Sequence, residues 1–184
     1  IDNNDCDYSC HDGGNYSLNF DGDDDYVDTG LIRESILDIT VEGFFKFEGS
    51  VDDGHIAIFG GSFGTFFIGK ASALDDDGTG LYIQDGSGVG YYGNHNAWDG
   101  QWHHIAYSFL DEPGIGGNGK LFIDGELVID QHFDGGHGNI WLGSEQENDG
   151  RFFDGQLDNV MISNTAKYSS SFNSPTYDNN ENTL

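Results

Sequence analysis

The sequence predicts an all-β fold, an antiparallel two-sheet β-sandwich of the jelly-roll type. Short runs of alternating apolar and polar residues recur about every ten residues, separated by glycine and aspartate clusters. No stretch of useful length has the 3.6-residue period of a helix. The composition agrees, because 29 glycines against 2 prolines suit many tight turns, and 14 Phe, 9 Tyr and 3 Trp can bury large areas.

The strongest prediction concerns residues 101–129. Residues 101–109 alternate as one strand, which places His103 and His104 on opposite faces. A glycine-rich loop over residues 112–119 then leads into a strand over residues 120–123. Asp124-Gly125 separates two alternating apolar runs, and this dipeptide favours a type I′ hairpin turn because both central residues need positive φ.

The remaining strands are predicted over residues 15–20, 26–28, 40–48, 55–59, 65–69, 80–84, 89–92, 139–143 and 156–163. Residues 31–37 are expected to form a short helical turn or an irregular crossover. Residues 164–168 are expected to form a short helical turn.

Four groups of segments resemble, in the expected order, the laminin G-like, concanavalin A-like family of lectin and glucanase domains. They are SLNFDG at 17–22 with DYV at 25–27, WHHIA at 102–106, LFIDGELV at 121–128, and IWLGS at 140–144 with DGQLDNVMI at 154–162. The resemblance implies one sandwich domain over residues 15–168, a polar arm over residues 1–14, and a polar tail or linker over residues 169–184. It also implies a piece of a longer multidomain protein, the alternative being an ordinary terminus. A chain that begins at Ile1 is expected to be a mature or excised fragment.

The charge excludes some partners. A formal net charge of −27 leaves six scattered cations, so binding to nucleic acid or to an anionic membrane surface is not expected. No apolar run is long enough to span a membrane. The acidity has two interpretations, a surface suited to saline surroundings or a set of carboxylates that bind divalent cations.

Cys6 and Cys10 are the only cysteines. A zinc site would need four ligands, and only His11 lies nearby. We therefore expect a local Cys6–Cys10 disulfide, which indicates an oxidising, extracellular setting.

A calcium site is expected at the acidic turn formed by Asp21, Asp23, Asp24 and Asp25. Side chains this close repel one another unless a cation neutralises them, and Ca²⁺ prefers oxygen ligands. The alternative is a solvated acidic turn without an ion. The resemblance implies a structural Ca²⁺ where the opening strand meets the closing one, which would add Asp158.

A sugar site needs an aromatic platform and polar groups for the hydroxyls. The stretch at residues 91–99 offers this mixture. The candidates are Tyr91, Tyr92, Asn94, His95, Asn96 and Trp98.

Catalysis is not expected. Glycosidases of this superfamily carry a Glu-x-Asp-x-x-Glu type spacing on one strand, and the sequence contains no such run. A serine nucleophile is not expected either. The predicted function is a non-catalytic extracellular module that binds carbohydrate or glycoconjugate for adhesion or targeting, with structural calcium. The alternative is a structural subunit of an extracellular filament or surface layer, packed against neighbouring copies.

Overall fold

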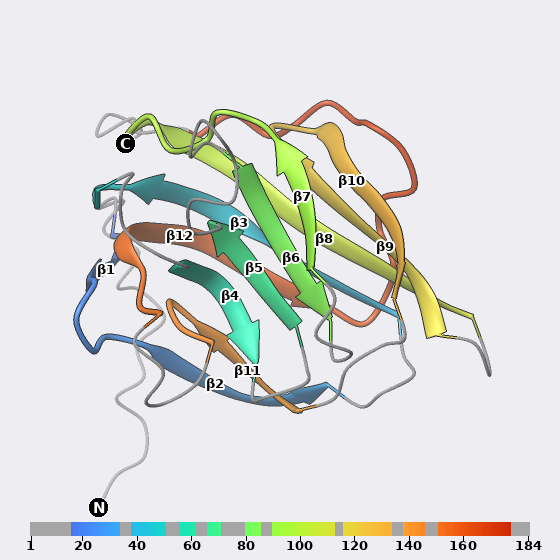
Figure 1. The fold of residues 1–184 in the computed structure, drawn as a ribbon, viewed down its shortest axis with the longest axis horizontal. Helices are drawn as coiled ribbons and strands as arrows, with labels where there is room; N and C mark the ends of the chain where they lie inside the picture. Colours follow the sequence, from blue (N-terminus) through green and yellow to red (C-terminus); the bar gives the residue numbers. More distant parts are fainter. Residues whose placement is uncertain are drawn as a thin grey trace, which may run out of the picture.

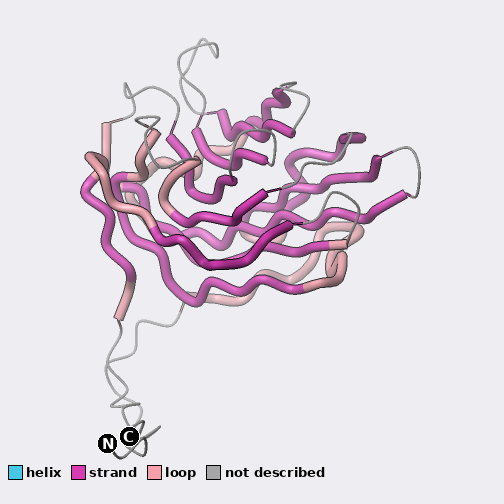
Figure 2. The backbone as a smooth tube through the Cα atoms, turned by 90° about the horizontal axis from the view of Figure 1, so that it is seen from below, coloured by secondary structure: helices cyan, strands magenta, loops and turns pink. Residues whose placement is uncertain are grey.

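The computed structural model describes residues 16–33, 38–50, 56–61, 66–70, 80–85, 90–112, 116–133, 138–145 and 151–177. Their strands form two antiparallel six-stranded sheets that lie face to face (Figures 1 and 2). No helix occurs among these residues. The predicted all-β sandwich is confirmed.

Sheet A, the rear layer in Figure 1, has the strand order β1-β12-β3-β8-β9-β10. Its strands are β1 (Leu18–Asp21), β3 (Ile39–Phe47), β8 (Trp102–Glu112), β9 (Gly116–Ile123), β10 (Glu126–Phe133) and β12 (Asp154–Ser163). Sheet B, the front layer, has the order β2-β11-β4-β5-β6-β7. Its strands are β2 (Val27–Arg33), β4 (Ile56–Gly61), β5 (Phe66–Lys70), β6 (Gly80–Asp85), β7 (Gly90–Asn94) and β11 (Gly138–Leu142).

The predicted hairpin is confirmed at β9 and β10. Asp124 and Gly125 have φ values of 50° and 79°, the positive pair that a type I′ turn requires. The predicted loop over residues 112–119 is too long, because β9 already begins at Gly116, which pairs with Glu112. Backbone pairing outweighs the weak strand propensity of glycine here.

Two predictions are wrong where the structure describes the residues, namely the helical turn or irregular crossover over residues 31–37 and the helical turn over residues 164–168. Residues 31–33 belong to β2, where Ile32 pairs with Asn139 of β11. Residues 164–168 are irregular, because backbone N–H groups of this segment donate to side chains of sheet A instead of to carbonyls within the segment. The N–H of Lys167 donates to Thr40 Oγ1, and that of Tyr168 donates to Ser108 Oγ.

The core lies between the sheets and takes the inward-facing side chains of both. In β8 these are Ile105, Tyr107 and Phe109, so the predicted alternation holds. His104 and Ser108 face outward from sheet A yet are also buried.

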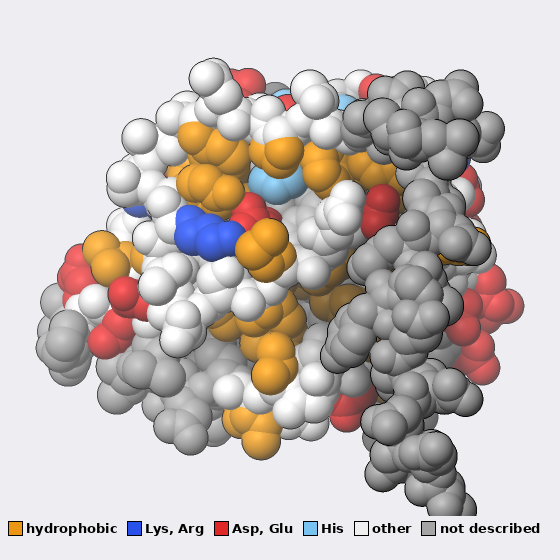
Figure 3. All heavy atoms as spheres, turned by 180° about the vertical axis from the view of Figure 1, so that it is seen from behind, with side chains coloured by type: hydrophobic (Ala, Val, Ile, Leu, Met, Phe, Trp, Pro, Cys, Tyr) orange, Lys and Arg blue, Asp and Glu red, His pale blue; other side chains and the backbone are white. Residues whose placement is uncertain are grey.

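A C-terminal strap, residues 164–177, covers that outer face. Phe172 packs edge-on against Phe122, and Tyr177 stacks on Trp102 at 4.2 Å between ring centroids. In the view from behind, hydrophobic side chains surround a histidine beside a cationic side chain (Figure 3). The described structure thus continues past the domain boundary predicted at residue 168.

Some predicted features lie outside the described residues. They include Cys6 and Cys10 with the whole predicted arm. Within the described ranges, no helix is long and apolar enough to cross a membrane.

Candidate functional site

The acidic turn follows β1. Gly22, with φ of 79°, bends the chain so that carboxylate oxygens of Asp21, Asp24 and Asp25 lie within 4.8 Å of one another. Two backbone donors shape this turn. The N–H of Asp23 donates to Asp21 Oδ1 at 2.9 Å, and that of Asp21 donates to Asp25 Oδ2 at 3.2 Å. Three convergent carboxylates form a donor set that fits a hard divalent cation such as Ca²⁺.

The structure does not bring Asp158 to this turn. The β1–β12 register places Asp154 opposite Asp21, and Asp158 lies four residues further along β12, roughly 13 Å at the usual strand rise. Asp158 instead accepts a hydrogen bond from the hydroxyl of Tyr177. Asp154 is the acidic residue of the closing strand that adjoins the turn, since a Cβ on Gly22 would lie 2.9 Å from its Cβ. Strand pairing reveals this neighbour, and the sequence alone does not fix the register.

The predicted sugar loop is partly in the core. Trp98 is only 5% exposed and packs against Phe45 and Phe47, with ring centroids at 5.7 and 5.3 Å. Its expected role as an exposed platform is therefore corrected, because the chain after β7 turns inward and buries the large apolar indole. His95 is half-buried and Asn96 is exposed. The backbone of Tyr91 and Tyr92 lies in β7, paired with Ile83 and Tyr82, and Asn94 ends that strand.

His103 links this loop to the β9–β10 turn. Its Nδ1 lies 2.7 Å from Asp124 Oδ2, and its Nε2 lies 3.0 Å from Asp99 Oδ1. Burial disfavours charge on the imidazole, yet the hydrogen bonds and attraction of the two carboxylates outweigh it and raise the pKa of His103. The hydrogen bond from His103 lowers the pKa of Asp99.

A second polar cluster lies beneath the strap. Glu42 is buried in β3 and contacts Lys167, Tyr168 and, at 3.6 Å, the Nε2 of His104. Burial lowers the pKa of His104, although Glu42 opposes the shift. The strap covers these groups, so they fasten the C-terminal segment to sheet A.

A serine-nucleophile motif occurs in the sequence, contrary to expectation. Residues 60–64 read Gly-Gly-Ser-Phe-Gly, which matches Gly-x-Ser-x-Gly. A nucleophile elbow joins a strand to a helix, whereas this stretch connects the antiparallel strands β4 and β5. The motif therefore lies in the wrong structural context for an elbow.

Comparisons with solved structures agree on the fold. The chain resembles a heptameric SAP-like pentraxin from Limulus polyphemus, with 16% identity, a TM-score of 0.64, and coverage of 83% of this chain and 77% of that one. It resembles domain 4 of AbnA, a GH43 extracellular arabinanase from Geobacillus stearothermophilus in complex with arabinotriose, with 23% identity, a TM-score of 0.51, and 82% and 66% coverage. It also resembles the LG1-3 region of the laminin alpha2 chain, with 15% identity, a TM-score of 0.52, and coverage of 74% of this chain and 24% of that one.

No curated protein sequence matches the chain significantly. The family model for the concanavalin A-like lectin/glucanases superfamily, laminin G type, matches residues 21–170. This span includes the acidic turn, the β8–β10 block and the closing strand, which are among the segments that carried the resemblance, whereas residues 17–20 of the opening strand lie just before it. The chain belongs to the concanavalin A-like lectin/glucanases superfamily.

Proposed function

We propose that this protein is a non-catalytic, extracellular carbohydrate-binding module that holds a structural Ca²⁺. The observation that carries the proposal is the acidic turn, where three carboxylates converge within 4.8 Å on a lectin-type sandwich. The likeness to domain 4 of an arabinanase, solved with arabinotriose, supports a sugar ligand. A Cys6–Cys10 disulfide is part of the proposal and fits the extracellular setting.

The proposed sugar surface is the end of β7 and the loop that follows, with Tyr91, Tyr92, Asn94, His95 and Asn96. Asn96 is exposed and free to offer its amide to sugar hydroxyls. The His103 bridge anchors the far end of this loop to the β9–β10 turn. Such anchoring reduces the entropy that sugar binding would cost.

A glycan array tests the proposal, with the purified chain in millimolar Ca²⁺ and again in chelator. We expect selective binding that weakens in chelator and in Asn96→Ala. Asn173→Ala, an exposed asparagine in the strap, is the matched control and should leave binding unchanged. If the chain binds no glycan on a broad array while its circular dichroism shows a folded β-sandwich, the proposal is overturned.

A further inference from the structure

The strap covers a pair of ionisable groups on the outer face of sheet A. Glu42 and His104 are only 5% and 3% exposed, although the alternation of their strands points both side chains away from the core between the sheets. The ring of Phe172 packs edge-on against the imidazole, with 6.0 Å between ring centroids, and Phe44 of β3 packs against it at 5.2 Å. Phe172 belongs to the strap, so this part of the cover can leave while sheet A stays intact.

The buried cluster holds one carboxylate for two potential cations. Glu42 accepts hydrogen bonds from Lys167 Nζ and, at 2.7 Å, from the hydroxyl of Tyr168. The Nε2 of His104 lies 3.6 Å from the same carboxylate, and its buried Nδ1 has no hydrogen-bond partner among the described residues. While the imidazole is neutral, the charges of Lys167 and Glu42 balance. A protonated imidazole adds a second cation and makes Nδ1–H a buried donor without an acceptor.

Two further ionisable side chains of the described residues flank His104. Asp124 Oδ1, in the β9–β10 turn, accepts the backbone N–H of His104 at 2.9 Å, and its Oδ2 lies 2.7 Å from Nδ1 of His103. Both carboxylate oxygens of Asp124 are thereby committed to groups other than the imidazole of His104. Burial is the largest effect on the pKa of His104 and lowers it, the charges of Glu42 and Asp124 oppose this shift, and the charge of Lys167 adds to it.

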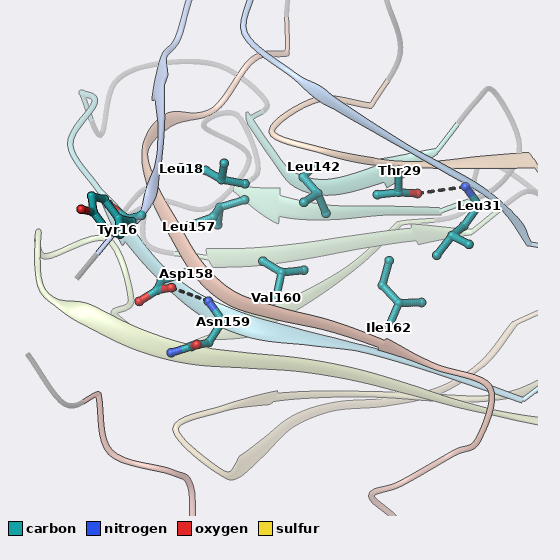
Figure 4. Close-up of a pocket in the computed structure, with 11 residues that line it drawn as sticks. Tyr16, Leu18, Thr29, Leu31, Leu142, Leu157, Asp158, Asn159, Val160 and Ile162 are labelled. Carbon is teal, nitrogen blue, oxygen red and sulfur yellow. Dashed lines mark hydrogen bonds between the residues drawn. The ribbon is translucent and has the colours of Figure 1, made fainter. Parts of the chain in front are cut away.

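The far end of the strap is held in a different way. The hydroxyl of Tyr177 donates to Asp158 of β12, and burial, followed by this bond and the charge of the carboxylate, raises the pKa of Tyr177 to about 12. Figure 4 shows the same carboxylate accepting the N–H of Asn159 at 2.7 Å. The Tyr177 ring also stacks on Trp102 at 4.2 Å. Tyr177 therefore keeps its proton at and below neutral pH, and the acid-sensitive contacts lie at the start of the strap.

We infer that the strap is an acid-sensitive cover, which opens over residues 164–172 when His104 takes up a proton. Opening brings water to the imidazole and separates it from Lys167, so the open state binds the proton more tightly than the closed state does. Acid therefore shifts the equilibrium towards the open state. Opening also uncovers Phe122 of β9, whose ring packs against Tyr168 and Phe172. This inference rests neither on the proposed sugar surface nor on the calcium site.

Hydrogen exchange of two strap amides measures the opening. The N–H of Lys167 donates to Thr40 Oγ1 at 3.0 Å and that of Tyr168 donates to Ser108 Oγ at 3.2 Å, so both amides are protected while the strap is closed. Exchange rates, corrected for the intrinsic effect of pH on exchange, give the equilibrium constant for opening. We expect this constant to rise as pH falls from about 7.5 to about 5, by at most about tenfold per pH unit because one proton is linked.

Two histidine variants assign the response. His104→Gln removes the titrating group and keeps a polar side chain, so its opening constant should be the same at both pH values. His132→Gln, the matched control, changes an exposed histidine of β10 in the same sheet and should keep the native response. An opening constant of the native chain that does not change with pH would overturn the inference. A rise that is as steep in His104→Gln would also overturn it, because acid would then act through Glu42.

Lys167→Met gives a test that keeps His104 in place. Lys167 is an exposed strap residue whose Nζ lies 3.1 Å from Met161 Sδ, so an unbranched apolar side chain fits there. Without the competing ammonium group, the protonated imidazole can pair with Glu42 alone, and we expect a weaker acid response than in the native chain. A response at least as steep as the native one would show that competition for Glu42 does not open the strap, and would overturn the inference.

Discussion

The hydroxyl of Tyr168 donates a 2.7 Å hydrogen bond to Oε2 of Glu42, which joins the C-terminal strap to a buried carboxylate of β3. Burial, followed by the hydrogen bond and the charge of Glu42, raises the pKa of Tyr168 to about 12. The ring of Tyr168 stacks on Phe172 at 3.8 Å, so one residue satisfies a buried charge and packs the strap. The strap is thus part of the folded domain.

Tyr168→Phe should destabilise the protein, because it keeps the ring but leaves Glu42 with one donor fewer. Loss of a hydrogen bond to a charged, buried group costs about 1–3 kcal/mol. Urea denaturation followed by tryptophan fluorescence measures this free energy of unfolding. Tyr16→Phe is the control, because Tyr16 is 79% exposed. An equal loss in both variants would contradict the assigned role of the hydroxyl.

The stabilising contribution of His103 should be largest below about pH 6.5 and should decrease as pH rises. Its pKa is raised in the folded state, so its contribution is complete below the unfolded value near 6.5 and is lost as pH rises through the folded value. His103→Gln should therefore flatten the decline of stability on the alkaline side. Urea midpoints measured from about pH 5 to about pH 9 give the profile. An unchanged alkaline slope would refute the double carboxylate bridge.

The neighbouring His104 should have the opposite effect on the pH dependence of stability, because its pKa is lowered in the folded state. Burial lowers its folded-state pKa, so the unfolded chain takes up a proton first as pH falls below about 6.5. Stability is therefore lost as pH falls from that value through the folded pKa. His104→Gln should flatten the acid side of the same profile and leave the alkaline side unchanged. A variant that moved both sides equally would indicate general loss of packing.

Much of this fold could be predicted from local chemistry, because alternation and turn residues act over short distances. Asp124-Gly125 specified its turn, and the period of two placed His103 and His104 on opposite faces of β8. The sequence also identified Asp21, Asp24 and Asp25 as neighbours, since they lie in one turn.

The predictions that failed concern features set by the pairing and packing of strands far apart in the sequence. The register between β1 and β12, set 133 residues apart at Asp21 and Asp154, decides which closing-strand acid adjoins the turn. From the sequence, Trp98 is an aromatic residue in a loop. Only the folded structure shows that it packs against Phe45 and Phe47 of β3. The strap is polar by composition, and its order comes from contacts with distant strands. These are the packing of its few aromatics on sheet A and hydrogen bonds to Thr40, Ser108, Glu42 and Gly125.

Calcium should raise the thermal stability of the protein. At a concentration about 100 times its Kd, a single ion adds about 2.7 kcal/mol, or roughly 5–10 °C in Tm. The double variant Asp21→Asn with Asp24→Asn should lose this response, and in chelator it should be at least as stable as the native chain because repulsion is relieved.

Differential scanning fluorimetry with Ca²⁺ and with chelator measures both effects. Asp23→Asn is the matched control, since Asp23 belongs to the same turn but lies outside the convergent trio. A native Tm that is the same with Ca²⁺ and with chelator, or a Tm of the double variant that still rises with Ca²⁺, would count against the metal site.

Gly125→Ala should release the strap. Both Gly125 and Gly30 have positive φ, 79° and 67°, so alanine is strained at either position by roughly 1 kcal/mol. At Gly30 the added Cβ meets nothing within 4 Å, whereas at Gly125 it would collide with the carbonyl oxygen of Phe172. The Gly125 carbonyl also accepts the Phe172 N–H at 2.9 Å, so the clash displaces a bonded segment. Gly30→Ala therefore measures the backbone strain alone, and Gly125→Ala should cost more and expose residues 168–177 to proteolysis. Equal losses of stability, with the strap equally protected in both variants, would show that it is not held at this turn.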